Sequence, residues 1–444
     1  MPTFHLVSLG CAKNLVDSEV MLGLLQEGGW DMEVDPSKAS VLLVNTCGFI
    51  QPAVEEAIEV ILEMASYKEG SDAVFLVVTG CLVQRYKQNL QEELREVDLF
   101  VGTEGVADIV RLLNGLLQGQ QKEKTFLPDR FLMDASYART LSTPPFRSSV
   151  KITEGCNNRC SYCMIPSIRG DLRSRSIEDI VLELKRLENG GLKELSLIAQ
   201  DLTAYGNDLD KETDLLRLLS AILENSAIPW IRLMYLYPSG VMPELLNLMQ
   251  SEERILPYMD IPFQHVSDSV LRRMHRRYGY EDLCGFIENV RNAVPDIALR
   301  TTMMVGFPGE TEEDIRQLEQ FLQVYRLDHV GVFSYTNEEG ALSEFYEDQC
   351  PEELKEERRN RILSLQADIS EKSLQKYVGQ TIPVLVEGLS RETDLLLEGR
   401  SAYQAPEIDG CVLINDGIAN PGEIVQVQIT EAQTYDLVGG VVLG

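Results

Sequence analysis

The chain has 444 residues, of which 44% are hydrophobic and 25% charged, and its formal net charge is −30. This is the composition of an ordinary globular protein, and no apolar run is long enough to cross a membrane, so we exclude a membrane-spanning protein and expect about three domains. The negative charge disfavours nucleic acid as a partner in the absence of a local basic patch and suits a basic protein partner, with solubility alone as the alternative explanation.

Residues 1–118 alternate between short apolar strands and helices. Each strand is followed by a segment with helical spacing, and the predicted strands cover 4–9, 41–44, 73–78 and 99–102. This alternation is typical of a doubly wound parallel sheet, so we expect an α/β fold here. Residues 119–148 lose the pattern and contain polar and proline-rich stretches, which indicates a linker.

A second alternating series covers residues 149–377. Its predicted strands are 150–153, 194–199, 231–235, 258–261, 297–305 and 330–333. Six β-α units predict a partial (β/α)6 barrel rather than a full eightfold one. A long polar helix over about residues 352–377 closes this region. Residues 378–444 contain short β-rich runs and turns, which predict a small antiparallel β-barrel of OB-like size.

Nine cysteines are present, and residues 1–5 lack the basic and apolar segments of a signal peptide. We therefore expect a cytoplasmic protein, in which metal binding or catalysis is favoured over disulfides. Three of the cysteines form a C-x3-C-x2-C pattern: Cys156, Cys160 and Cys163. Three thiolates so close together can bind one face of an iron–sulfur cluster and leave one iron open. A zinc ribbon needs a second C-x2-C pair, which the chain lacks, and buried structural cysteines are the other alternative.

Cys11, Cys47 and Cys81 each follow the carboxyl end of a predicted parallel strand and precede a helix. That edge of a doubly wound sheet binds ligands, and helix N-termini help to keep thiolates ionised. Each cysteine alone would be interpreted as a small buried hydrophobe, but three in one topological position predict a second three-cysteine cluster. The remaining cysteines are isolated and are expected to be structural: Cys284, Cys350 and Cys411.

The loop around Cys156 resembles that of the radical S-adenosylmethionine superfamily, which follows the first strand of a partial barrel. The resemblance implies that the open iron chelates the amino and carboxylate groups of S-adenosylmethionine. It also implies that an electron from the cluster breaks the C–S bond, giving methionine and a 5′-deoxyadenosyl radical. Tyr162 stands where the superfamily places an aromatic residue against the adenine, and a core tyrosine is the alternative interpretation.

Motifs along the whole chain resemble the methylthiotransferase family within this superfamily. They are Ser8–Asn14, Asn45–Ile50 and Gly80–Tyr86 in the N-terminal part, Ile198–Asp201 and Gly306–Thr311 in the barrel, and Ala405–Gly410 in a tail similar to the TRAM domain. Lys13-Asn14 and Phe49-Ile50 match the branch that modifies an aspartate of ribosomal protein S12, whereas the tRNA branch usually has Gln-Met-Asn and Val-Arg. Gln404 departs from the acid expected in this branch.

The resemblance implies two 4Fe-4S clusters, S-adenosylmethionine, and transfer of a methylthio group to the β-carbon of the aspartate. It also implies an electron donor such as flavodoxin or ferredoxin. One rival is a tRNA adenosine methylthiotransferase, which shares all six cysteines. The other is a non-catalytic iron–sulfur electron carrier, which would need no S-adenosylmethionine pocket.

The charge of the tail favours a protein substrate over tRNA. Residues 376–444 contain 3 basic residues (Lys376, Arg391 and Arg400) and 10 acids, a balance of −7. A protein that binds a phosphate backbone needs cations, which the tail lacks. Charge complementarity instead suits a basic ribosomal protein.

Several further side chains are weaker site candidates. Those expected near the carboxyl ends of barrel strands are Gln200, Asp201, Gln264, His265, Arg300 and Tyr335. Gly306 and Gly309 are expected to let the backbone approach the cofactor. For each of these residues a turn or capping role is the alternative. The basic clusters indicate docking of substrate or electron donor, with a solvated helix face or ion pairs with the abundant acids as the alternative: Arg173, Arg175, Arg272, Arg273, Arg276 and Arg277.

Overall fold

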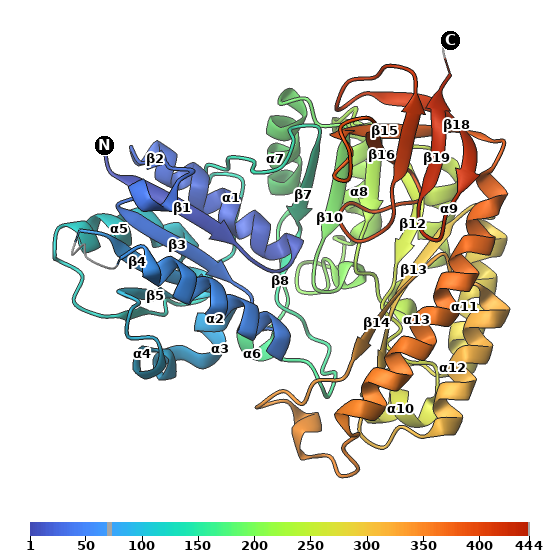
Figure 1. Ribbon diagram of the computed structural model, residues 1–444, viewed down its shortest axis with the longest axis horizontal. Helices are drawn as coiled ribbons and strands as arrows, with labels where there is room; N and C mark the ends of the chain where they lie inside the picture. The colour runs from blue at the N-terminus through green and yellow to red at the C-terminus, as the bar shows by residue number, and fades with distance from the viewer. Residues whose placement is uncertain (69–72, 443–444) are drawn as a thin grey trace.

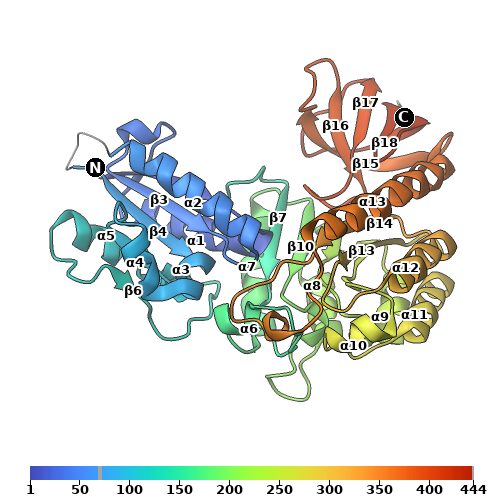
Figure 2. The ribbon, with the colours of Figure 1, turned by 60° about the horizontal axis from the view of Figure 1, so that its bottom comes forward.

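The computed structural model describes residues 1–68 and 73–442, which form three parts. Figure 1 shows an N-terminal sheet with its helices on the left, a larger sheet with outer helices on the right, and a small β-barrel above the larger sheet. In the turned view of Figure 2 the small barrel stands apart from the N-terminal sheet. No helix among the described residues is long and apolar enough to cross a membrane.

The N-terminal part is a six-stranded sheet in the order β2-β1-β3-β4-β5-β6, and every neighbouring pair is parallel. Its strands are β1 (Thr3–Ser8), β2 (Asp31–Met32), β3 (Val41–Thr46), β4 (Phe75–Gly80), β5 (Leu99–Val101) and β6 (Thr125–Phe126). The sheet confirms the expected doubly wound fold. The two-residue strands β2 and β6 were not predicted, because two residues carry no apolar pattern, and β6 falls within the segment interpreted as a linker.

Helices cover both faces of this sheet. The α-helices are α1 (Ala12–Glu27), α2 (Gln51–Ser66), α3 (Cys81–Tyr86), α4 (Leu90–Glu93) and α5 (Ile109–Leu117), with 3-10 turns at η1 (Pro36–Lys38), η2 (Lys87–Asn89) and η3 (Thr103–Asp108). One face of β3 packs with α1 and α5, and the other face packs with α2 and α3. All six residues of β3 are therefore buried, which explains its continuous apolar run.

The central part is a six-stranded open barrel in the order β14-β13-β12-β11-β10-β7, and all its neighbouring pairs are parallel. Its strands are β7 (Arg147–Lys151), β10 (Glu194–Ile198), β11 (Trp230–Leu233), β12 (Ile255–Asp260), β13 (Ala298–Val305) and β14 (His329–Ser334). A separate antiparallel pair, β8 (Thr153–Glu154) and β9 (Arg173–Ser174), encloses the C-x3-C-x2-C loop. The predicted partial barrel of six strands is confirmed.

Helices pack on the outer face of this barrel. They are α7 (Ile177–Asn189), α8 (Leu215–Asn225), α9 (Pro243–Ser251), α11 (Tyr280–Ala293), α12 (Glu312–Tyr325) and α13 (Glu352–Leu374). Shorter elements are α6 (Ile165–Ile168), α10 (Asp268–Arg273), η4 (Leu202–Ala204), η5 (Pro238–Gly240), η6 (Leu342–Phe345) and η7 (Gln375–Tyr377). The sequence fixes the start of α12 through a capping box, in which Thr311 and Asp314 satisfy each other's backbone N–H groups.

The C-terminal part is a closed five-stranded barrel in the order β15-β16-β17-β19-β18. Its strands are β15 (Thr381–Leu389), β16 (Leu397–Ser401), β17 (Val412–Asp416), β18 (Ile424–Ala432) and β19 (Leu437–Val441). The predicted small β-barrel is confirmed. Four neighbouring pairs are antiparallel as expected, and β17 and β19 pair in parallel.

The small barrel docks on the face of the central sheet opposite the outer helices. Arg400 forms an ion pair of 2.5 Å with Glu194 of β10. The hydroxyl of Tyr258 in β12 donates a hydrogen bond of 2.7 Å to Asp409. These side chains are buried, so the small barrel is held by polar contacts that are shielded from water.

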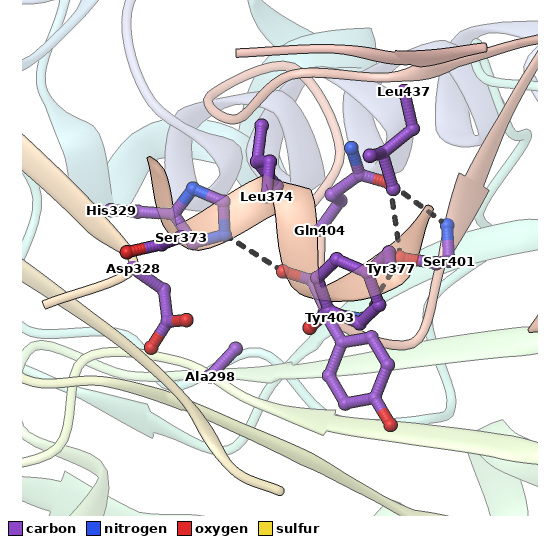
Figure 3. Close-up of a pocket in the computed structure, with 10 residues that line it drawn as sticks. All are labelled: Ala298, Asp328, His329, Ser373, Leu374, Tyr377, Ser401, Tyr403, Gln404 and Leu437. Atoms are coloured by element: carbon purple, nitrogen blue, oxygen red, sulfur yellow. Dashed lines mark hydrogen bonds between the residues drawn. The ribbon is translucent and has the colours of Figure 1, made fainter. Parts of the chain in front are cut away.

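A small pocket lies at this junction, between the first residues of β13 and β14, the end of α13, and the small barrel (Figure 3). The ring Nε2 of His329 bonds the Tyr403 carbonyl across it at 2.8 Å. Gln404 lies here too, and its side-chain oxygen accepts from the backbone N–H and the hydroxyl of Ser401. Gln404 therefore shapes a buried turn. The pocket contains none of the predicted site residues.

Two three-cysteine sites between the N-terminal sheet and the barrel

The first site is formed where three neighbouring strands of the N-terminal sheet end. Cys11 precedes α1 after strand β1, Cys47 follows β3, and Cys81 begins α3 directly after β4. Gly10 lets two of these loops meet: its φ is +89°, and a Cβ atom at this position would lie 2.7 Å from the Cβ of Cys47. The sheet order β1-β3-β4 thus brings together three cysteines that are far apart in the sequence.

The three thiols differ in their readiness to ionise. Burial raises the pKa of the Cys81 thiol to about 11, although the Arg169 guanidinium acts to lower it. Burial also raises the pKa of the Cys47 thiol. Cys11 is exposed to solvent but lies among protein atoms that disfavour its thiolate. The Lys13 ammonium and the backbone N–H of Asn14 outweigh this effect, so the pKa of the Cys11 thiol lies below its usual value.

The second site is the loop between β8 and β9. Gly155 begins it with φ +72°, and a Cβ there would lie 2.1 Å from the carbonyl oxygen of Asp171, so only glycine fits. The Cys156 N–H donates to the Gly170 carbonyl at 3.1 Å, which ties the two ends of the loop together. Burial, together with the neighbouring Cys160, raises the pKa of the Cys163 thiol to about 12.

The donor sets of both sites fit an iron–sulfur cluster. Cys11 acts to raise the pKa of Cys47 and Cys81, and Cys160 acts to raise the pKa of Cys156 and Cys163, so the thiols of each group share one environment. Iron would displace the thiol protons and offset the free-energy cost of holding three thiolates close together. In the described part of the chain no three His, Cys, Asp or Glu side chains are spaced for a single metal ion. A four-iron cluster takes one thiolate per iron, so its ligands stand further apart than those of one ion.

The two sites adjoin. Cys81 packs in one apolar cluster with Met164 and Ile168, which follow Cys163 in the sequence. The Arg169 guanidinium lies 3.3 Å from the sulfur of Cys81. A group from the barrel therefore contacts a sulfur of the N-terminal site.

Each site has one guanidinium at a sulfur. In the second site Arg276 approaches the Cys160 sulfur at 3.4 Å, and it stacks on the rings of Tyr237 and Tyr278. Hydrogen bonds to ligating sulfurs tune the potential of a bound cluster. The sequence placed Arg276 only in a basic cluster and did not single out Arg169. A buried arginine has no local sequence signal that separates it from an exposed one.

A buried ion-pair network joins the two parts of the molecule beside these sites. Asp17 of α1 bonds Lys151 at 2.5 Å and Arg169 at 2.8 Å. Glu154 bonds the same two cations at 2.5 and 3.2 Å. Two carboxylates thus balance two cations, and all four side chains are buried. The network fixes the N-terminal sheet relative to the barrel loop.

Replacing Arg169 with methionine should strongly weaken this junction. The change leaves two buried carboxylates with one cation, which typically costs about 3–5 kcal/mol. Arg130→Met is the matched control, because Arg130 forms an exposed pair with Asp171 at 3.7 Å, and such pairs contribute about 0–1 kcal/mol. We expect the urea midpoint of the cluster-free protein to fall far more for Arg169→Met. Equal shifts in the two variants would contradict the network's role.

The other predicted cofactor-binding residues lie in different surroundings. Asp201 accepts from the Asn158 side-chain amide at 2.7 Å and from the Thr203 N–H at 3.1 Å, so it links the cysteine loop to η4. Gln200 is half-buried two residues after β10. Tyr162 packs edge-on against Phe307 at a ring distance of 6.4 Å.

Three candidates are tied up by protein contacts. Arg300 lies in the first half of β13 rather than at its carboxyl end, and it pairs with Asp260 at 2.8 Å and Asp409 at 3.3 Å. Gly306 and Gly309 have φ of +75° and +77°. A Cβ atom would meet the side chain of Lys355 at Gly306 and the guanidinium of Arg273 at Gly309. Close protein packing alone therefore explains the need for both glycines.

The basic clusters divide into two groups. Arg173 and Arg175 form ion pairs with acids, as the structural alternative predicted: Arg173 with Glu104, and Arg175 with Asp179 and Glu183. Arg272 and Arg277 are exposed and form no ion pair with any described residue. These two side chains remain available for docking a partner.

Comparison with known proteins gives one consistent result along the chain. The sequence matches the radical SAM superfamily over residues 150–322, the uncharacterized protein family UPF0004 over 3–102 and the TRAM domain over 378–442. A Desulfotalea psychrophila protein named ribosomal protein uS12 methylthiotransferase RimO is 58% identical, with 99% of each chain covered. The protein of that name from Syntrophotalea carbinolica is 44% identical, covering 98% of this chain and 96% of its own.

Solved structures agree at the level of the fold. The radical S-adenosylmethionine methyltransferase TsrM from Kitasatospora setae superposes with a TM-score of 0.57 at 17% identity, covering 75% of this chain and 73% of its own. The cobalamin-dependent S-adenosylmethionine radical enzyme OxsB gives a TM-score of 0.51 at 12% identity, covering 82% and 56%.

Proposed function

This chain belongs to the ribosomal protein uS12 methylthiotransferase family, and we propose that it attaches a methylthio group to the β-carbon of an aspartate in uS12. Family membership makes it a radical S-adenosylmethionine methylthiotransferase, an enzyme that uses a 4Fe-4S cluster and S-adenosylmethionine. We propose two such clusters, one held by Cys11, Cys47 and Cys81 and one by Cys156, Cys160 and Cys163. The observation that carries this proposal is the contact of Cys81 with Met164 and Arg169, which follow the second cysteine group in the sequence, because sulfur transfer requires both clusters at one substrate.

When bound at Cys156, Cys160 and Cys163, the cluster supplies the electron for reductive cleavage of S-adenosylmethionine. The chain's own residues would position the reaction. Arg169 and Arg276 hold positive charge at one sulfur of each site. Asp201 holds the cysteine loop through Asn158, and Tyr162, which lies within that loop against Phe307, would be the aromatic residue at the adenine.

A direct test uses the purified, anaerobically reconstituted protein with uS12, S-adenosylmethionine and a reductant. We expect a methylthio group on one aspartate of uS12, located by tandem mass spectrometry. A tRNA adenosine modified in its place would favour the tRNA rival. Absence of 5′-deoxyadenosine under reduction would favour the electron carrier.

The C-terminal barrel supports a protein substrate over tRNA. Of the three basic residues in positions 376–444, Arg400 is buried against Glu194 and Lys376 pairs with Asp328 at 3.2 Å, whereas Arg391 is exposed. Several of its acids are exposed: Glu392, Asp394, Asp416, Glu423 and Glu431. The exposed charged residues of this part are therefore predominantly acidic, which disfavours a phosphate backbone.

We expect salt to weaken binding of uS12, with a larger effect on the association rate than on dissociation, because exposed charges steer association and are screened. Changing Glu392, Asp394 and Glu398 together to lysine should weaken binding at low salt without reducing the iron content. Binding kinetics at low and high salt would measure both effects.

The matched control reverses three exposed acids at the far end of the N-terminal sheet: Glu92, Glu93 and Glu96. This variant has the same net charge as the tail variant, so it isolates the position of the charges from their number. An equal loss of affinity for uS12 in both variants, or an affinity that does not depend on salt, would remove the electrostatic support for a protein substrate.

A further inference from the structure

Lys13 is a buried cation without an acidic partner. It lies in the first turn of α1, two residues after Cys11, and its side chain is only 6% exposed. No carboxylate of the described residues lies within ion-pair distance of its ammonium group, and no described side chain accepts a hydrogen bond from it. Burying an unpaired charge is costly, so such a group normally indicates a missing partner.

The other buried lysines show what is missing. Lys151, which is 3% exposed, bonds two carboxylates. Lys355, also 3% exposed, bonds Glu352 at 2.5 Å. Among the buried lysines of the described residues, Lys13 alone forms no ion pair with a carboxylate.

The ammonium of Lys13 contacts the face of the Tyr235 ring, 3.5 Å from its centroid. Tyr235 directs its ring there from a left-handed backbone, with φ +61°. Its N–H donates to Asp260 at 3.2 Å and its carbonyl accepts from Leu202 at 2.9 Å, so the ring is held from two sides. A ring face attracts an ammonium group but leaves the N–H groups of that ammonium free to donate to an anion.

Asp260 is the acid nearest to this pair, but it is occupied. Its Oδ1 accepts from Arg300 at 2.8 Å, and its Oδ2 accepts from the Tyr235 backbone. Asp260 therefore acts on Lys13 only at a distance and forms no ion pair with it. The ammonium lies on the Tyr235 ring and near Cys11, which is exposed, so an anion that binds at Cys11 comes close to it.

We infer that Lys13 is a specificity-determining residue that binds the carboxylate of the substrate aspartate. This inference rests on the proposed function. The carbon that receives the methylthio group is bonded directly to that carboxylate, so the carboxylate must come close to the site of Cys11. Lys13 supplies the charge that an aspartate needs and an asparagine does not.

A double-mutant cycle across the interface tests this assignment. Dissociation constants are measured at high salt for wild type and Lys13→Met, each with uS12 and with uS12 in which the target aspartate is asparagine. Wild type should bind the aspartate form roughly 10- to 100-fold more tightly, as a hydrogen bond to a charged group implies, and Lys13→Met should lose this preference. Loss of the preference in the variant supports the assignment.

Equal preference for aspartate in wild type and Lys13→Met would overturn the assignment. Lys38→Met is the matched control, because Lys38 is an exposed lysine of the same domain. The Lys38→Met variant should prefer the aspartate form of uS12 as strongly as wild type does. Iron content and circular dichroism of Lys13→Met establish that it is folded and loaded. If Lys13 served the cluster alone, the cluster potential would shift while the aspartate preference persisted, which also overturns the assignment. Failure of wild type to modify uS12 would instead count against the proposed function.

Discussion

Replacing Cys156, Cys160 and Cys163 together with alanine should abolish cleavage of S-adenosylmethionine and halve the iron content. Two four-iron clusters correspond to about eight iron atoms per chain after anaerobic reconstitution, and loss of one set of ligands leaves about four. Alanine offers no ligand, and the C-x3-C-x2-C loop has no neighbouring cysteine of its own to take over. Iron analysis and 5′-deoxyadenosine formation under reduction measure the two effects.

The matched control replaces the three isolated cysteines, Cys284, Cys350 and Cys411, with alanine. This variant removes the same number of thiols from positions that belong to neither site, so its iron content and deoxyadenosine formation should equal those of wild type. A full iron content in the variant at Cys156, Cys160 and Cys163, or loss of iron in the control, would show that these three cysteines do not hold the barrel cluster.

Replacing Cys11, Cys47 and Cys81 together should eliminate methylthiolation and leave cleavage of S-adenosylmethionine partly intact. Radical generation needs only the barrel cluster, whereas sulfur insertion needs both sites. Some loss of cleavage is expected, because Cys81 packs on Met164 beside the barrel loop, and the substitution leaves a small cavity there. Product analysis by mass spectrometry, with 5′-deoxyadenosine measured in the same reaction, separates the two activities.

The informative comparison is between these two triple variants. Each should retain about half of the iron, so iron content alone does not distinguish them. Only the variant at Cys156, Cys160 and Cys163 should lose deoxyadenosine completely. Complete loss of cleavage in a folded variant that keeps its barrel cluster would contradict this division of labour.

The grouping of the cysteines was predictable because it depends on topology. Cys11, Cys47 and Cys81 each follow a strand, and parallel strands end at the same edge, so the sheet order alone brings them together. Cys156 to Cys163 needed only local spacing. The capping box at Thr311 was likewise local, and α12 begins there as its sequence requires.

Contacts between the parts of the molecule were not predictable from local patterns. Arg169 reaches the sulfur of Cys81 across 88 positions of sequence, and Lys13 meets Tyr235 only because the sheet edge faces the barrel. Gly306 and Gly309 showed the opposite difficulty. Their pattern indicated approach to a cofactor, but the side chains of Lys355 and Arg273 occupy the space that a Cβ would need.

The tail illustrates how structure refines a charge count. The composition of residues 376–444 predicts an acidic tail, but it counts Arg400 as one of three available cations. Arg400 is buried between Glu194 and Glu387, so it contributes to docking within the chain and not to binding a partner. Burial of individual charged side chains, Arg400 and Asp409 among them, is the information that the composition lacks.

Mass spectrometry of uS12 from cells with and without this gene tests the central claim most directly. We predict a methylthio group on one aspartate of uS12 in cells that carry the gene, its absence in the deletion, and its return when the gene is restored. Digestion of tRNA from the same cells should give the same nucleosides in all three cases. An unchanged mass of uS12, together with loss of a methylthio-adenosine from tRNA in the deletion, would contradict the account.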